Sequence, residues 1–202
     1  MLFRSARIDT LYQARDTLGL DDEANRVLEL TWKSFARSGA NLDGPEQERL
    51  AGIGERLAAL GTTFSQNVLA DERDYALFLD GDDDFAGLPE SLIASMRAAA
   101  EARGQSGKCA VTLSRSIIEP FLTFSERRDL RETAFNAWIA RGESDEGRDN
   151  RPIVAEMVKL RAEKAALLGY ESYAHYKLDD TMAKTPQAVR SLLETEIGRA
   201  HV

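Results

Sequence analysis

The sequence predicts a mainly α fold, a multi-helix domain with one minor pair of short strands. Apolar side chains recur every three or four positions along most of the 202 residues, which is the period of an amphipathic helix. Capping and terminating residues bound these stretches, with Asp21 or Asp22 before one expected helix and Gly142 after another. Two short apolar runs, at about 75–79 and 110–113, lack that period. We therefore expect these runs to be strands that pair with each other.

The expected helices follow in order from their caps and their periodicity. Pro45 opens the longest one, because a proline without an N–H is harmless in the first turn, and apolar residues up to Val68 predict a core helix. Ser125 is expected to cap a helix that Gly142 closes, and the polar stretch 142–150 to be a solvated loop. The expected helices cover about 4–18, 22–38, 45–68, 89–103, 126–141, 152–168, a short stretch from 172, and 186–200.

Composition limits both the architecture and the class of partner. Apolar residues make up 43% and charged residues 30% of the chain, as in an ordinary globular protein. No shift in composition divides the sequence, so we expect a single helical domain over residues 1–202. Lys and Arg number 26 against 34 Asp and Glu, which gives a formal net charge of −8. That charge repels nucleic acid, so no nucleic-acid partner is expected.

Three sequence features concern the compartment. No run of about 18 apolar residues could cross a membrane, and the opening MLFRSARIDT lacks the apolar segment of a secretory signal. Cys109 is the only cysteine, which excludes an internal disulfide and suits a reducing environment. We expect a cytoplasmic protein without a membrane partner.

The segment 102–109 approaches a phosphate-binding loop. Gly107 and Lys108 fit the pattern GxxxxGK[ST], but Ala102 replaces the first glycine and Cys109 replaces the hydroxyl residue that would reach Mg²⁺. The segment also leads from an expected helix into an expected strand, which is the reverse of the required order. We interpret it as a plain helix-to-strand turn.

The acidic run 80–84 begins like a calcium loop. Carboxylates at its first, third and fifth positions match the start of an EF-hand. Phe85 then stands where glycine is needed, and Ser91 where a bidentate Glu is needed. An acidic surface turn is the favoured interpretation.

The residues that most often serve as nucleophiles or metal ligands are scarce. His175 and His201 are the only histidines, whereas a zinc-peptidase helix needs two His four positions apart with a Glu between them. His175 has Asp179 at that spacing, and Cys109 lies in an apolar run where a buried small residue is expected. We therefore predict no catalytic residue and no metal ligand in this chain, and the substrate-binding residues stay unknown.

The stretch 125–132 holds six charged residues in eight positions. Its three arginines could bind an anion, but acidic residues alternate with them at helical spacing. Such i,i+3 and i,i+4 pairs are typical of a salt-bridged helix face. That is the favoured interpretation, with anion binding as the alternative.

Five segments form an ordered set: FSQN at 64–67, GLP at 87–89, VTLSRSIIEPFLTFSERRDLRE at 111–132, AALLGYESYA at 165–174 and MAKTPQAV at 182–189. Together they resemble the thimet oligopeptidase family of zinc metallopeptidases. The likeness covers roughly residues 10–197 and is greater to the bacterial peptidyl-dipeptidase (dipeptidyl carboxypeptidase) branch than to the oligopeptidase A branch.

The resemblance implies a mostly helical protein whose two lobes flank a channel for short peptides. Family members hold zinc with an HExxH motif on one helix and a Glu on a later one, and the Glu of the motif is the general base. This sequence contains no His-Glu pair, so none of the family's metal or catalytic residues carries over. The resemblance implies zinc in the full-length parent, with none expected in this chain.

We therefore expect a fragment: the helical lobe and channel wall that precede the HExxH motif of a peptidase acting on short peptides, inactive by itself. The alternative is a stand-alone helical peptide-binding or scaffold module without catalysis. Action as a dipeptidyl carboxypeptidase or as an endopeptidase stays open. The C-terminal helices carry apolar residues on more than one side, so a homodimer through them is expected. These residues are Ile153, Val154, Met157, Val158, Leu160, Leu167, Val189, Leu192, Leu193 and Ile197.

Overall fold

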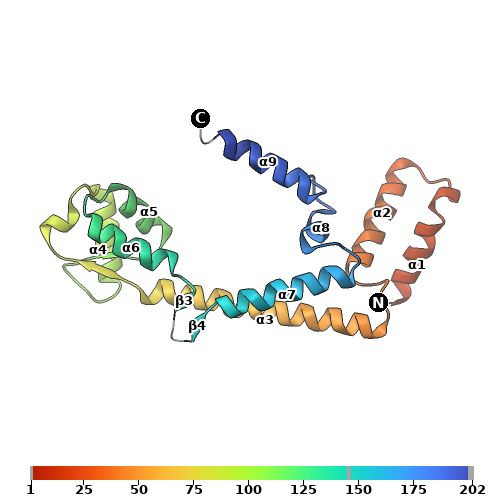
Figure 1. Ribbon diagram of the computed structural model, residues 1–202, viewed down its shortest axis with the longest axis horizontal. Helices are drawn as coiled ribbons and strands as arrows, with labels where there is room; N and C mark the ends of the chain where they lie inside the picture. The colour runs from red at the N-terminus through yellow and green to blue at the C-terminus, as the bar shows by residue number, and fades with distance from the viewer. Residues whose placement is uncertain (1, 145–146, 200–202) are drawn as a thin grey trace. The chain divides into compact units, whose positions relative to one another are not determined.

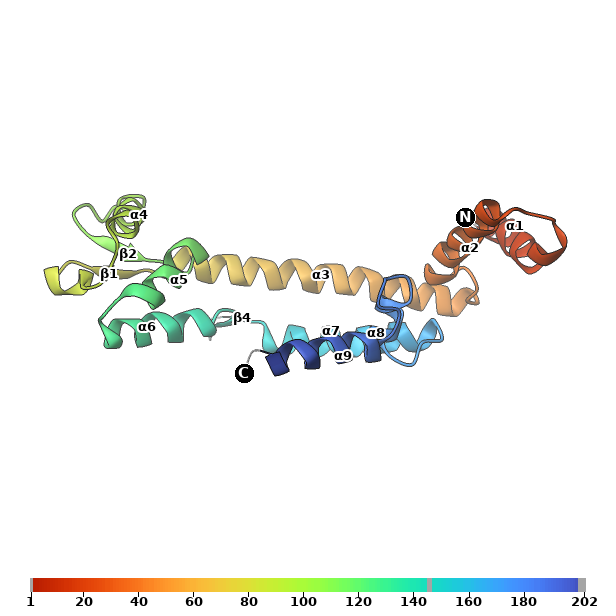
Figure 2. The same ribbon diagram turned by 90° about the horizontal axis from the view of Figure 1, so that it is seen from above.

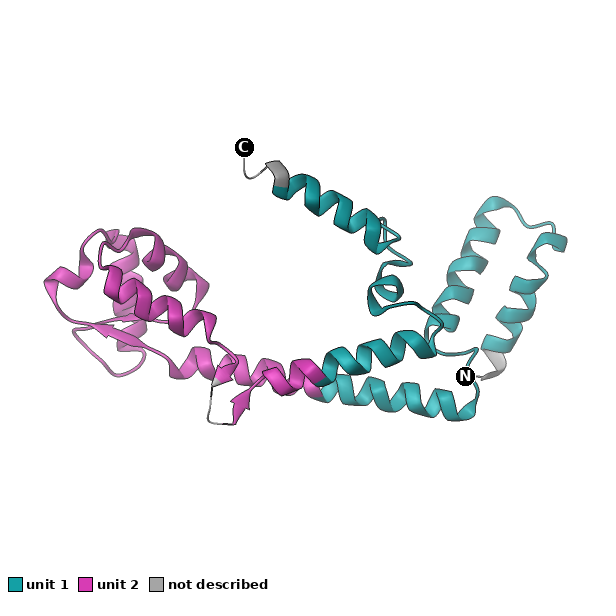
Figure 3. Ribbon diagram, viewed as in Figure 1, with its two compact units in different colours: residues 1–59, 156–202 teal, residues 60–155 magenta. Residues whose placement is uncertain are grey.

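The structure is a computed structural model that describes residues 2–144 and 147–199. Helices dominate it, so the predicted mainly α fold is confirmed. The chain forms two compact units (Figure 3): unit 1 comprises residues 1–59 and 156–202, and unit 2 comprises residues 60–155. The long helix α3 (Gly44–Asp74) and the helix α7 (Arg151–Leu167) each have residues in both units. The expected single domain over 1–202 stays a prediction.

Unit 2 is built on the predicted strand pair. The strand β1 (Leu77–Leu79) runs antiparallel to β2 (Cys109–Val111), with Leu77 opposite Val111. The turn η2 (Asp82–Phe85) follows β1, and the unit also contains the helices α4 (Glu90–Glu101), α5 (Arg115–Phe124) and α6 (Arg128–Ile139). Their inward side chains form one apolar core: Leu79, Leu92, Met96, Cys109, Val111, Ile117, Ile118, Phe121 and Ala134. Figure 1 shows these elements gathered around the C-terminal end of α3.

The predicted helix start at Ser125 is wrong, and the helix α5 was missed. Ser125 ends α5 instead, is 1% exposed, and accepts a hydrogen bond on its Oγ from the N–H of Arg127 at 3.2 Å. Pro120 lies inside α5 and removes one helical N–H. Burial of Ile117, Ile118 and Phe121 holds the helix nevertheless, since tertiary packing supplies most of the stability of a short helix.

The predicted solvated loop at 142–150 is partly wrong. It contains two short paired strands, β3 (Glu143–Ser144) and β4 (Arg148–Asp149), with Glu143 opposite Asp149. Asn150, which follows them, is only 4% exposed. A polar composition alone predicted solvent exposure here, whereas the side chains of Arg148 and Asn150 contact α3.

Unit 1 consists of helices and a single 3-10 turn among its described residues. The helix α2 (Asp22–Arg37) begins after Asp21, one of the two residues expected to cap it, and the Asp21 carboxylate accepts from the N–H of Ala24 at 2.8 Å. The other elements that lie entirely in unit 1 are α1 (Leu2–Gln13), η1 (Arg15–Thr17), α8 (Tyr173–Leu178) and α9 (Pro186–Arg199). The helix expected at 4–18 is therefore shorter than predicted, and residues 200–202 lie outside the described part of the chain.

The helix α3 is continuous over its whole length (Figure 2). A reciprocal capping box starts it: the Asp43 carboxylate accepts from the N–H of Glu46 at 2.9 Å, and the Glu46 carboxylate accepts from the N–H of Asp43 at 3.2 Å. The expected core role holds at Ile53 and Leu60, which are 0% and 4% exposed. The helix runs on to Asp74, six residues beyond the predicted end at Val68.

None of the described helices combines the length and the apolar character needed to cross a bilayer.

Candidate functional site

The segment 102–109 is the predicted turn between α4 and β2. Gly104 and Gly107 adopt positive φ angles of 73° and 85°, which glycine tolerates without strain. Cys109 is 2% exposed in β2, and burial raises the pKa of its thiol. A buried thiol of raised pKa is a poor nucleophile. The interpretation of Cys109 as a small core residue is confirmed.

The acidic run 80–84 ends in a carboxylate that already has partners. Asp84 accepts from the backbone N–H of Gly81 at 3.3 Å and from the guanidinium of Arg127 at 2.7 Å. An arginine at that distance neutralises the charge that a calcium ion would need. The surface-turn interpretation therefore fits the structure.

His175 lies in the short helix α8, and its contacts are with the residues that precede this helix. Its backbone N–H and its ring Nδ1 lie 3.4 Å and 2.9 Å from the Oγ of Ser172, which caps the helix as predicted. Its Nε2 lies 3.6 Å from the carboxylate of Glu171, one helical turn away. These contacts fix the imidazole beside its own helix. His201 lies outside the described residues.

The charged stretch 125–132 forms ion pairs, but those of Arg127 are not the i,i+3 and i,i+4 pairs of the favoured helix face. Arg127 contacts Asp129 at 2.7 Å in addition to Asp84, and this hydrogen bond lowers the pKa of Asp129 to about 2. The guanidinium of Arg131 donates to the carbonyl oxygen of Ser125. Because Arg127 and Arg131 have local acceptors, these two side chains offer little to an external anion.

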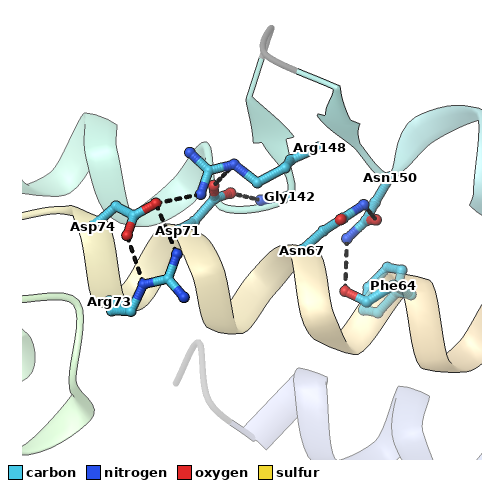
Figure 4. Close-up of polar contacts among 8 residues, drawn as sticks. All are labelled: Phe64, Asn67, Asp71, Arg73, Asp74, Gly142, Arg148 and Asn150. Atoms are coloured by element: carbon cyan, nitrogen blue, oxygen red, sulfur yellow. Dashed lines mark hydrogen bonds and ion pairs between the residues drawn. The ribbon is translucent and has the colours of Figure 1, made fainter.

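The sequence reasoning missed a cluster of polar contacts that holds the segment 142–150 against α3 (Figure 4). We call it the polar junction. Its members are Asn67, Asp71 and Asp74 of α3, with Gly142, Arg148 and Asn150. All of them belong to unit 2.

Asn150 is the buried member of the polar junction. Its Oδ1 accepts from the Nδ2 of Asn67 at 2.8 Å, and its own Nδ2 donates to the carbonyl oxygen of Phe64 at 3.2 Å. Its backbone N–H donates to Gly142 at 2.7 Å, while its carbonyl accepts from Val154 at 2.8 Å. The last bond belongs to the first turn of α7. Asn150 therefore sets where α7 begins relative to the 64–67 turn of α3.

Asp71 and Asp74 hold the rest of the segment. Asp71 accepts from the backbone N–H of Gly142 at 2.8 Å and lies 3.4 Å from the guanidinium of Arg148, which also donates to Asp74 at 2.6 Å. Arg73, and after it Arg148, lowers the pKa of Asp74 to about 2, because hydrogen bonds from both guanidinium groups favour the ionised carboxylate.

Gly142 is required by the geometry of the polar junction. Its φ angle is +78°, and a Cβ added there would lie 2.8 Å from the Nδ2 of Asn150. Any larger residue would therefore displace the buried amide as well as strain the backbone.

The sequence did carry a signal for the polar junction. Asn67, Asp71 and Asp74 stand at i, i+4 and i+7 on one helix face, which makes a polar stripe on a helix that was expected to be apolar. Reading the polar stretch 142–150 as solvent-exposed concealed its partners.

A second cluster lies in unit 1 around Arg37. Its guanidinium donates to the carbonyl oxygen of Tyr176 at 2.9 Å, lies 4.5 Å from the centre of the Tyr176 ring and 3.3 Å from the carboxylate of Asp179. The hydroxyl of Tyr170 donates to the same carboxylate at 3.2 Å. A cleft of about 350 Å³ adjoins the cluster, lined by Trp32, Lys33, Ala36, Arg37, Asn41, Leu42, Leu167, Leu168, Tyr170 and Asp179. The cluster anchors the segment 170–179 to α2.

These two clusters can position helices, but they do not fit a zinc ion. Among residues 2–144 and 147–199, no group of three or more His, Cys, Asp and Glu side chains is arranged to hold a metal. The carboxylates of the polar junction are paired with arginines instead. No catalytic step follows from the described side chains.

Comparison with known proteins finds similarity to one peptidase family. A model of Peptidase family M3 matches residues 121–201. The dipeptidyl carboxypeptidase of Escherichia coli (strain K12) is 34% identical over 195 residues, which are 96% of this chain and 29% of that protein. The oligopeptidase A of Salmonella typhimurium is 34% identical over 186 residues, or 90% of this chain and 27% of that protein. The chain therefore spans less than a third of the length of these relatives, and the family resemblance seen in the sequence is confirmed.

Proposed function

Since the chain is homologous to the peptidases of family M3, we propose that it forms part of a zinc-dependent peptidyl-dipeptidase or oligopeptidase acting on short peptides. It supplies a helical segment of the channel wall and not the catalytic zinc site. The observation that carries the proposal is the 34% identity to a dipeptidyl carboxypeptidase over 96% of this chain, an extent that includes residues of both units.

The contribution of this chain is to hold its helices in place. A wall that admits unstructured peptides and excludes folded proteins must keep its shape. Buried, fully hydrogen-bonded polar groups specify one arrangement of the elements that carry them. Asn150 and Asp71 do this for the start of α7, and Arg37 does it for α8.

In the proposed whole protein, a bound zinc ion would supply the Lewis-acid chemistry for peptide hydrolysis. Its ligands belong to residues other than those described in this chain. A cytoplasmic location completes the proposal, supported by a single, buried cysteine that needs no oxidising compartment.

The open reading frame and the purified protein together test the proposal. We expect an HExxH motif downstream of Val202, and we expect the longer product to release dipeptides from a blocked tripeptide until a chelator is added. The 202-residue chain should show no such hydrolysis and no stoichiometric zinc by elemental analysis. A stop codon directly after Val202 would favour the stand-alone peptide-binding module instead. Chelator-sensitive hydrolysis by the short chain would contradict the assignment of catalysis elsewhere.

A further inference from the structure

A second cleft, of about 340 Å³, lies in unit 1 where the C-terminal end of α2 meets the first turns of α3 and the end of α7 (Figure 1). Its volume falls within the roughly 300–1,000 Å³ of small-molecule sites, which are mostly apolar with a few polar groups. The lining follows that pattern: Phe35, Leu50 and Ala51 supply apolar surface, and Arg37 and Lys164 supply charge. The cleft therefore has the size and the composition of a small-molecule site.

The charges that line this cleft are of one sign. Among the described residues, Arg37 and Lys164 line it and no Asp or Glu does. The guanidinium of Arg37 and the ammonium of Lys164 lie 4.5 Å and 5.4 Å from the centre of the same ring, that of Tyr176 in α8. Both distances are within the range of a cation–π contact. Tyr176 therefore holds two positive charges near each other beside an apolar surface.

The two cations differ in their counter-charges. Arg37 lies 3.3 Å and 3.4 Å from the carboxylates of Asp179 and Asp180, which neutralise it. Lys164 forms no ion pair within the described part of the chain, and its ammonium faces the Tyr176 ring. The ammonium of Lys164 is thus the charge in this cleft that an anionic ligand can neutralise.

We propose that this cleft binds an apolar monocarboxylate, a small organic acid with a hydrocarbon body. Its carboxylate pairs with the ammonium of Lys164, and its hydrocarbon part contacts Phe35 and Leu50. Removal of the hydrocarbon from water supplies affinity in proportion to the area buried. The charge-assisted hydrogen bond to Lys164 fixes the orientation of the ligand.

The lining also selects against other anions. A free amino acid or dipeptide carries an ammonium group for which the described lining offers no carboxylate, so it gains no second ion pair there. A nucleotide carries several negative charges, whereas Lys164 alone lacks a counter-charge and the chain has a net charge of −8. The inference goes beyond the proposed peptidase function and does not depend on it, because no peptide bond is cleaved at this cleft.

Titration of the ¹⁵N-labelled 202-residue chain with sodium octanoate, followed by amide chemical shifts, tests the proposal. We expect saturable shifts in 35–51 and around Lys164, with a Kd of about 1 mM for a ligand of about ten non-hydrogen atoms. Octanamide has nearly the same shape without the charge. It should bind about fivefold more weakly, because it forms no ion pair.

A charge variant tests the role of Lys164. Lys164→Met keeps most of the side-chain stem, so it should weaken octanoate binding about fivefold and octanamide binding less than about twofold. Lys159→Met is the matched control, since Lys159 is an exposed lysine of the same helix that does not line the cleft. It should leave both constants within about 1.5-fold.

A filling variant tests the location. Ala51→Trp places a large ring in the cleft and should abolish the saturable shifts with both compounds. Ala58→Trp adds the same ring two turns further along α3, at an exposed position outside the lining, and should leave binding unchanged. Well-dispersed amide spectra must show that all the variants are folded.

Equal affinity for octanoate and octanamide would overturn the proposal, because the charge would then play no part. So would a Lys164→Met variant that binds octanoate as tightly as the parent chain. Shifts confined to other surfaces, saturable binding that survives Ala51→Trp, or no saturable shift up to about 10 mM octanoate would each show that the cleft is not the site.

Discussion

The two units of the chain are stabilised by different forces. Unit 2 has an apolar core in which Met96, Ile118 and Phe121 are 0% exposed. In the described part of unit 1, fully buried apolar side chains are few and lie on α3 and α7 at Ile53, Leu160 and Ala165.

Ion pairs do much of the joining in unit 1. Two arginine–glutamate pairs, each with two hydrogen bonds, link α3 to α7. Arg37 links α2 to α8. The α3–α7 pairs are Arg49–Glu163 and Arg56–Glu156. Each guanidinium is more than half exposed.

This difference has a physical consequence. Burial of apolar surface contributes about 25 cal/mol per Å² and depends little on moderate salt. Exposed ion pairs contribute little each, and added salt weakens them. Unit 2 should therefore respond to cavities in its core, and unit 1 to ionic strength.

The largest expected effect is a cavity in unit 2. Phe121→Ala removes a ring that is fully buried among α4, α5 and the strand pair, and should lower the free energy of unfolding by about 3–5 kcal/mol. Urea unfolding followed by circular dichroism measures the loss. Phe124→Ala is the matched control, because that ring is 49% exposed and its removal should cost less than about 1 kcal/mol. Equal losses in the two variants would show that α5 is not the centre of the core.

A smaller effect is expected at the polar junction. Asn150→Ala leaves the amide of Asn67 without its acceptor and removes the bond to Phe64. The expected loss is about 1–3 kcal/mol, with faster amide exchange over 147–155. Asn136→Ala, at an exposed position of α6, should change the stability by less than about 0.5 kcal/mol. If the exchange of 147–155 stays unchanged in Asn150→Ala, the junction does not hold the start of α7.

The smallest expected effect is the pH dependence that comes from Asp74, at the edge of the polar junction. The pKa of Asp74 is lowered to about 2 from an ordinary value of 3.8. The native state therefore holds this proton less tightly than the unfolded state. The stabilisation that results is present above pH 3.8 and is lost as the pH falls through about 2. Carboxyl NMR titration measures the value directly.

Two variants test which arginine lowers the pKa of Asp74 more. Arg73→Gln should raise the pKa of Asp74 more than Arg148→Gln does, because the hydrogen bond from Arg73 is the largest cause of the shift. A pKa near 3.8 in the unaltered chain, or the reverse order of the two variants, would contradict the geometry of Figure 4.

The elements that sequence could predict are those whose signal is local. Ser172 caps its helix as expected, and Asp21 is the one of two expected candidates that caps α2, because a cap acts within three residues. The strand pair was found because both runs are apolar and bounded by turns. By contrast, α5 is stabilised by burial of its side chains against elements distant in sequence. It also contains Pro120, and local helix propensity therefore argued against a helix there.

The polar junction could not be derived from local patterns for the same reason. Asn67 and Asn150 are 83 positions apart, and a polar residue in a polar stretch is exposed by default. Only the fold shows that Asn150 is buried. The family resemblance was visible earlier because it depends on an ordered set of segments and not on any single contact.

Native-state hydrogen exchange at two ionic strengths tests the contrast between the units most directly. Raising NaCl from about 0.05 M to 0.5 M should lower protection in 44–59 and 156–167 about two- to fivefold, because the α3–α7 ion pairs are screened. Protection in α4 and α5 should change less than about 1.5-fold, since apolar burial holds them. An Arg49→Gln/Arg56→Gln variant should exchange faster at low salt and lose the salt dependence. The same salt response in both units, or an unaltered response in that variant, would contradict the account.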